Sequence, residues 1–261
     1  MTSIDYAELD QLAMAVPLFY PQPDRSAAPP GATDLLLEVA PGVSLGARHY
    51  VADPASPTIL YFHGNGEVVG DHDDTALLYH QIGLNLFVVD YRGYGRSGGR
   101  PSFATLFADA HPVAEQFHTV LDQRGMAAPR FLMGRSLGGY PSIELAARRP
   151  AGFRGLILES AAANLRRLLP RFAMPVAPGL LEPLLAAHEA KIASITLPTL
   201  MLHGERDELI PLSHATGIHD LLKSEDRSLV VIRGAGHNDI LFRGQERYFG
   251  AIRAFVDRQL G

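Results

Sequence analysis

One serine of this chain has sequence surroundings that could make it a nucleophile. Ser136 stands at the centre of GRSLG, residues 134–138, after the apolar run 131–133 and before a helical pattern. A serine at such a strand–turn–helix junction holds a strained backbone, and the flanking glycines let strand and helix approach without a clash. The pattern predicts that the hydroxyl of Ser136 projects clear of a sheet. It also predicts that the N–H of Leu137 faces the point where an oxyanion would form.

A serine hydroxyl is a weak nucleophile unless a neighbouring base takes its proton. The chain has eleven histidines, and one of them, His237, follows the apolar run 229–232 in a loop with glycines at 234 and 236. A histidine in a loop after a late strand can reach a serine that lies at the end of an earlier strand. His237 is therefore the candidate base.

A third residue is needed to orient the imidazole and to stabilise its charged form. Asp207 lies shortly after the apolar run 199–202 and is the candidate. Glu159, at the carboxyl end of the run 156–158, is the alternative. The order Ser136, Asp207, His237, with separations of 71 and 30 residues, leaves room for the intervening strands.

The segment HGNG, residues 63–66, follows another apolar run, 58–62. Its two glycines allow the backbone to curl, so that an N–H group, that of Asn65 in our interpretation, points inward. Together with the N–H of Leu137, it would form a pair of donors for an oxyanion. His63 could act as an acid or base, but we interpret it as a brace of this loop by hydrogen bonding.

Short apolar runs alternate with longer amphipathic segments along most of the chain. Such runs suit parallel strands that are covered on both faces, and the alternation with helices predicts an α/β protein. Two strands at 35–39 and 43–51 would precede this pattern, separated by a Pro–Gly turn. Pro112 should kink or split the helix expected at 103–124. Residues 4–16 have a loosely helical spacing. The further strands are expected at 58–62, 86–89, 131–133, 156–158, 199–202 and 229–232, and the further helices at 74–82, 140–149, 212–223 and 245–260.

One segment interrupts the alternation. Residues 163–193 contain helical, apolar stretches broken by prolines, without a strand. An insertion between two strands at this point could cover a site. We expect four of its apolar side chains to line a substrate pocket: Leu168, Phe172, Met174 and Leu184.

Composition excludes several classes of site and partner. The chain has 261 residues, no cysteine and a formal charge of −5. The absence of cysteine excludes disulfides, thiolate metal sites and a cysteine nucleophile. The mild negative charge gives no reason to expect nucleic acid or an anionic membrane as a partner. The acidic N-terminal sequence and the lack of a long apolar stretch favour a cytoplasmic protein without a membrane span.

Two further motifs have simpler interpretations than a cofactor site. The acidic run DHDD, residues 71–74, could bind a metal, but carboxylates also cap a helix N-terminus, which we favour. Glycines at 93, 95 and 98 satisfy the spacing of a dinucleotide fingerprint. They are separated from the preceding strand, and no acidic residue follows at the distance that such a fingerprint requires. We therefore expect no metal and no cofactor.

Five motifs together resemble the α/β-hydrolase superfamily, in particular its serine esterase, thioesterase and peptidase-like members. They lie at residues 63–66, 90–97, 134–138, 203–207 and 236–237. The resemblance implies a single domain over 1–261, built on a mostly parallel eight-stranded sheet whose second strand is antiparallel. It also implies a small cap after the sixth strand, for which residues 163–193 are in the right place. Residues 1–34 would form an N-terminal extension.

The resemblance implies a serine hydrolase that cleaves a small-molecule ester, thioester or amide through an acyl-enzyme. The alternative is a non-catalytic binding or scaffold protein on the same fold, since a fold does not dictate function. Acyl transfer to an acceptor other than water is a further possibility. The oligomeric state is left open.

Overall fold

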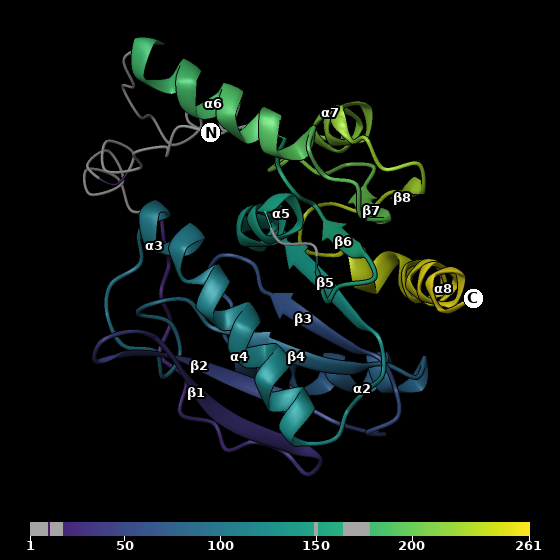
Figure 1. Cartoon of the computed structure of the whole chain (residues 1–261). Helices are drawn as coiled ribbons and strands as arrows, with labels where there is room; N and C mark the ends of the chain where they lie inside the picture. The colour runs from purple at the N-terminus through teal and green to yellow at the C-terminus, as the bar shows by residue number, and fades with distance from the viewer. Residues whose placement is uncertain (1–9, 11–17, 149–150, 164–177) are drawn as a thin grey trace.

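A mixed β-sheet forms the centre of the molecule (Figure 1). The computed structural model describes residue 10 and residues 18–148, 151–163 and 178–261. Within these residues the sheet has eight strands in the order β1-β2-β4-β3-β5-β6-β7-β8. Strand β2 runs antiparallel to both of its neighbours, and every other pair is parallel. The predicted mostly parallel sheet with an antiparallel second strand is therefore confirmed.

The elements follow the predicted alternation closely. The strands are β1 (Ala32–Ala40), β2 (Val43–Tyr50), β3 (Thr58–Phe62), β4 (Asn85–Val89), β5 (Arg130–Arg135), β6 (Leu156–Glu159), β7 (Thr199–Gly204) and β8 (Arg227–Ile232). The helices are η1 (Val69–His72), α2 (Asp73–Gln81), α3 (Phe103–Ala108), α4 (Ala110–Gln123), η2 (Ser136–Gly138), α5 (Gly139–Arg148), α6 (Pro178–Ile192), α7 (Ser213–Leu221) and α8 (Ile240–Leu260).

The inner strands are apolar throughout because helices cover both faces of the sheet. Successive side chains of a strand point to opposite faces. In β3, Leu60 and Phe62 belong to the core that α3, α4 and α5 cover, whereas Ile59 and Tyr61 belong to the core that α2 and α8 cover. A strand buried on both sides reads as a continuous apolar run, which is why β3 could be located to the residue.

Two predicted helices differ in their boundaries. The helix expected at 103–124 is split at Asp109, three residues before Pro112. Pro112 itself lies in the first turn of α4, where its missing N–H has no intrahelical acceptor to lose. Helix α8 contains the helix expected at 245–260, and Gly244, with a φ of −143° and a ψ of 33°, separates it from a first turn at 240–243.

The chain before the sheet also contributes structure. Residues 18–26, which we call the N-terminal strap, bond to residues 90–98, which we call the glycine-rich loop. The N–H of Gly95 donates to the carbonyl of Gln22 at 2.8 Å. The helix predicted at 4–16 lies outside the described residues, with the exception of Asp10. Asp10 accepts the N–H groups of Phe103 at 2.5 Å and Ala104 at 3.2 Å, at the start of α3.

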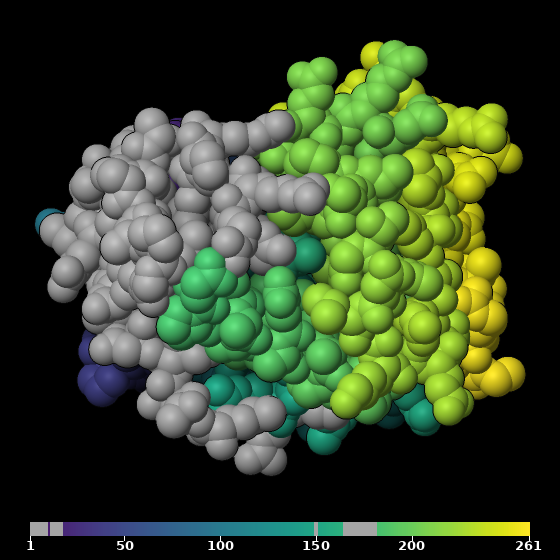
Figure 2. All heavy atoms as spheres, turned by 90° about the horizontal axis from the view of Figure 1, so that it is seen from above, coloured from purple at the N-terminus to yellow at the C-terminus, as the bar shows by residue number. Residues whose placement is uncertain are grey.

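Helix α6 is the described part of the predicted insertion. It lies with α7 above the sheet in Figure 1, and both helices contribute to the face seen in Figure 2. The first half of the insertion, residues 164–177, lies outside the described residues. No helix among the described residues is long and apolar enough to cross a membrane.

Candidate active site

Ser136 occupies a strained turn between β5 and α5. Its φ is +51°, a left-handed value that few residues other than glycine adopt. The glycines beside it are required by close backbone packing. A Cβ atom at Gly134 would lie 2.2 Å from the carbonyl oxygen of Gly138, and one at Gly138 would lie 1.9 Å from that of Phe62. The two ends of the turn therefore pack closely on each other, and the turn packs closely on the end of β3.

The structure brings Ser136, His237 and Asp207 together. The Oγ of Ser136 lies 3.0 Å from Nε2 of His237, and Nδ1 of His237 lies 2.7 Å from Oδ2 of Asp207. The three residues come from the loops after β5, β8 and β7, which end at the same edge of the sheet. Parallel strands deliver their carboxyl ends to one edge, so residues 101 and 30 positions apart can meet there.

Asp207 is held as a buried carboxylate. Its side chain is fully buried, and its Oδ1 accepts the N–H groups of Leu209 at 3.0 Å and Ile210 at 2.7 Å. Burial alone would raise the pKa of Asp207, but the hydrogen bond and charge of His237, with the N–H of Ile210, hold it below the ordinary 3.8. An ionised Asp207 fixes the ring of His237 with Nδ1–H toward the carboxylate and Nε2 toward the serine.

The alternative acid, Glu159, has other partners. It is 1% exposed at the end of β6. Its Oε1 accepts a hydrogen bond from Nε of Arg135 at 3.1 Å, and its Oε2 accepts one from the hydroxyl of Tyr248 at 2.6 Å. Asp207, not Glu159, therefore contacts the imidazole in this structure.

The side chain of Asn65 is fixed by hydrogen bonds that the sequence did not reveal. Its Oδ1 accepts the N–H of Tyr20 at 3.0 Å and the hydroxyl of Tyr94 at 2.6 Å, and its Nδ2 donates to the carbonyl of Leu18 at 2.7 Å. The partners are 45, 29 and 47 residues away in the chain, so no local signal could have identified them. The strap thus holds the loop that contains the candidate oxyanion donor.

His63 is buried within the same loop and bonds in two directions. Its Nδ1 lies 2.8 Å from the carbonyl oxygen of Gly64, and its Nε2 lies 3.2 Å from Oδ1 of Asp90. Burial would lower the pKa of His63, but the hydrogen bond and charge of Asp90 raise it above the ordinary value. This arrangement matches the bracing role that we inferred for His63.

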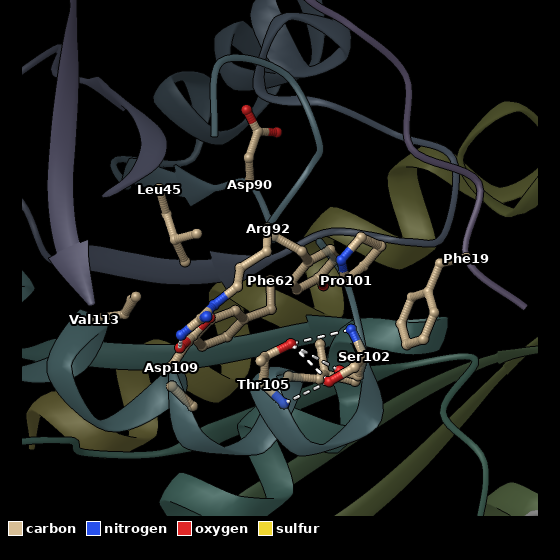
Figure 3. A pocket seen from close by; sticks show the side chains of 13 residues that line it. Phe19, Leu45, Phe62, Asp90, Arg92, Pro101, Ser102, Thr105, Asp109 and Val113 are labelled. Carbon is tan, nitrogen blue, oxygen red and sulfur yellow. Dashed lines mark hydrogen bonds and ion pairs between the residues drawn. The ribbon is translucent and has the colours of Figure 1, made fainter. Parts of the chain in front are cut away.

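Besides the pair of His63 with Asp90, an ion pair between Arg92 and Asp109 holds the glycine-rich loop. It lies beside a small cavity of about 10 Å³. Both Nε and Nη2 of Arg92 donate to the carboxylate of Asp109 at 2.7 Å, and Figure 3 shows the two side chains pointing toward one another. The cavity beside the pair is lined largely by apolar side chains, such as those of Leu45, Phe62 and Val113. The ion pair of Arg92 with Asp109 thus attaches this loop to the start of α4.

Of the four predicted substrate-pocket residues, only Leu184 lies within the described part of the chain. Leu168, Phe172 and Met174 lie outside the described residues. Leu184, on α6, is 8% exposed and packs into the core on the α5 side of the sheet. Among the described residues, no group of three or more histidine and carboxylate side chains is arranged to hold a metal ion.

Known proteins resemble this chain in sequence and in fold. Residues 53–187 match the family described as serine aminopeptidase, S33. An uncharacterized protein of Mycobacterium tuberculosis is 30% identical over 241 residues, which cover 90% of this chain and 83% of that protein. Human alpha/beta hydrolase domain-containing protein 17B is 34% identical over 213 residues, which cover 79% and 68%.

Solved structures share the fold at lower identity. An esterase of Pyrococcus furiosus superposes with a TM-score of 0.74 at 17% identity, covering 92% of this chain and 100% of that one. Est1E from Butyrivibrio proteoclasticus, solved with ferulic acid, gives a TM-score of 0.70 at 19% identity, with coverages of 87% and 99%. Similarity at this level establishes the fold alone.

Proposed function

This chain belongs to the serine aminopeptidase S33 family of the α/β-hydrolase superfamily, and on that premise we propose that it is a serine hydrolase. It would cleave a carboxylic ester, thioester or amide through an acyl-enzyme intermediate. The observation that carries the proposal is the unbroken hydrogen-bonded series from Ser136 through His237 to Asp207. A binding or scaffold protein would have no need of this alignment.

In the first half of the reaction, the Oγ of Ser136 attacks the carbonyl carbon while Nε2 of His237 takes its proton. The N–H groups of Leu137 and Asn65 would donate to the oxyanion of the tetrahedral intermediate. His237 then gives the proton to the leaving group. In the second half, His237 activates a water molecule, which releases the acid and frees Ser136.

Asp207 supports both halves without exchanging a proton. Its carboxylate keeps Nδ1 of His237 protonated, so that Nε2 presents a lone pair to the serine hydroxyl. When the ring becomes cationic, the buried negative charge stabilises it. Serine, imidazole and backbone N–H groups supply all the chemistry of this scheme, which needs no metal or cofactor.

The apolar character of the insertion supports an acyl or alkyl group of modest size as the substrate. A panel of esters, thioesters and aminoacyl amides would define the preferred bond. A cytoplasmic location stays a prediction.

The nucleophile can be tested directly. We expect Ser136→Ala to abolish turnover of a short p-nitrophenyl ester and covalent labelling by a fluorophosphonate, with the fold unchanged by circular dichroism. Ser194→Ala is the matched control, because that hydroxyl donates to the carbonyl of Lys191 within its own turn. Undiminished turnover in Ser136→Ala would sink the proposal. An unlabelled, inactive wild-type protein would favour the scaffold alternative.

A further inference from the structure

A largely buried guanidinium belongs to the residue next to the nucleophile. Arg135 precedes Ser136 in the chain, and its side chain is 13% exposed. Its Nη1 pairs with Glu67, and its Nε donates to Oε1 of Glu159 at 3.1 Å. Its Nη2 donates to the carbonyl oxygen of His237 at 3.1 Å and to Oδ1 of Asn238 at 3.0 Å. Every nitrogen of the guanidinium therefore has a partner.

The partners of Arg135 come from the loops that carry the proposed chemistry. Glu67 stabilises the loop of residues 63–66 that contains the candidate oxyanion donor, which we call the oxyanion loop. Its Oε2 also accepts the N–H of Gly64 at 2.8 Å. The carbonyl of His237 belongs to the base itself. One side chain next to the nucleophile is thus bonded to the backbone of the base and, through Glu67, to the loop of Asn65.

Two carboxylates of opposite charge, those of Glu67 and Glu159, pair with Arg135. Burial would raise the pKa of Glu67, but His72 and Arg135 beside it hold the pKa well below its usual range. Burial would likewise lower the pKa of Arg135, yet Glu159 and Glu67 raise it. A planar guanidinium can serve several acceptors at fixed angles, which the ammonium of a lysine cannot reproduce.

We propose that Arg135 is a positioning residue, which keeps the loop of His237 and the oxyanion loop in register with Ser136. The inference rests on the proposed hydrolase function. Because a misplacement of about 1 Å between reacting groups costs about 100-fold in rate, loss of this register should lower kcat rather than substrate affinity.

A cavity of about 210 Å³ borders the same guanidinium. It is lined by polar groups that include Arg135, Glu67, Glu159 and Asn238, and by the rings of tyrosines on the α2 and α8 side of the sheet. A small planar cation can therefore reach the two carboxylates if the arginine side chain is removed. This permits a chemical rescue, which a general loss of stability would not show.

The first test compares two conservative variants. We expect Arg135→Lys to lower kcat for a p-nitrophenyl ester about 10- to 100-fold, with KM within about threefold of the wild type. Arg130→Lys is the matched control: Arg130 has a similar side-chain exposure of 14% and pairs with Asp122 and His118 at the opposite end of β5 from Ser136. It should reduce thermal stability and leave kcat unchanged. Equal effects of both variants on kcat would overturn the inference.

The second test is the rescue. Guanidinium chloride at low millimolar concentration, far below denaturing conditions, should restore part of the kcat of Arg135→Ala along a saturating curve. Urea and potassium chloride at the same concentrations should not. Absence of rescue in a folded Arg135→Ala protein would contradict the proposal.

A second variant keeps the proposal testable if Arg135→Ala does not fold. Glu67→Gln keeps the shape of the side chain and removes its charge, and it should also lower kcat with little change in KM. An unchanged kcat in Glu67→Gln would count against the proposed register. Failure of the hydrolase assignment is recognised separately, because Ser136→Ala would then retain activity, independently of the results for the Arg135 variants.

Discussion

At the scale of single residues, Asp207 combines full burial with a negative charge. Two backbone N–H groups and one imidazole satisfy its carboxylate, which is why it can stay ionised out of contact with water. Its charge is directed at His237 and hardly screened by solvent. The side chain thus orients the imidazole of His237 toward Ser136.

We expect Asp207→Asn to lower kcat about 10³- to 10⁴-fold, because the amide stabilises the wrong tautomer of His237. Steady-state kinetics with a p-nitrophenyl ester would measure the loss, and Glu159→Gln serves as the comparison. If Glu159→Gln were the more damaging of the two and its kcat loss matched that of a triad acid, the assignment of the acid would be wrong.

At the scale of elements, α5 links the turn of Ser136 to the described part of the insertion. Glu144 on α5 is buried and pairs with Lys191 near the end of α6, with Arg148 one turn on at 3.0 Å and with His111 of α4 at 3.4 Å. Burial opposes its ionisation, but these cationic and hydrogen-bonding partners lower the pKa of Glu144 to about 2. Helix α5, which begins three residues after Ser136, is thereby joined to α6 by an ion pair.

This attachment predicts a specific pH dependence. The folded pKa of Glu144 lies below its ordinary value of 4.5. Its contribution to the free energy of unfolding is therefore complete above about pH 4.5 and is lost as the pH falls toward about 2. Urea unfolding should show wild type more stable than Glu144→Gln by up to about 3 kcal/mol at pH 6.5. The difference should shrink by pH 3, and a constant difference over this range would contradict the ion-pair explanation.

At the scale of the whole molecule, the N-terminal strap is bonded to loops that come much later in the chain. The hydroxyl of Tyr94 is the centre of this connection. It accepts the N–H of Tyr20 at 2.9 Å and donates to Oδ1 of Asn65 at 2.6 Å, and the side chain is completely buried. Residues that precede the sheet thus help to fix a loop at its carboxyl edge.

We expect Tyr94→Phe to destabilise the protein by about 1 kcal/mol, since Oδ1 of Asn65 and the N–H of Tyr20 would each lose one hydrogen-bond partner. The midpoint of thermal unfolding should fall by several degrees, and kcat should fall as well. Tyr50→Phe is the control, because its hydroxyl bonds to Val69 at 2.6 Å and Asp73 at 2.8 Å, away from Asn65. An equal loss of kcat in both variants would show that the effect is general instability.

The sequence by itself determined the order of the elements and the candidates for the site. Buried parallel strands are apolar along their whole length, so runs such as 58–62 and 199–202 could be recognised locally. The turn at Ser136 could be recognised too, because close backbone packing demands glycine at 134 and 138. The split before Pro112 was placed within three residues, since proline fits the first turn of a helix better than its interior.

Only the tertiary structure decided which polar side chains meet. The sequence left Glu159 as a rival acid, and the fold gives it to Arg135 while Asp207 receives His237. The bonds from the strap to Asn65 and from Arg135 to the loop of His237 span from 45 to 103 residues. Hydrophobic periodicity is a local property of the chain, whereas a buried polar group is satisfied by whichever partner the packed sheet brings within hydrogen-bond distance.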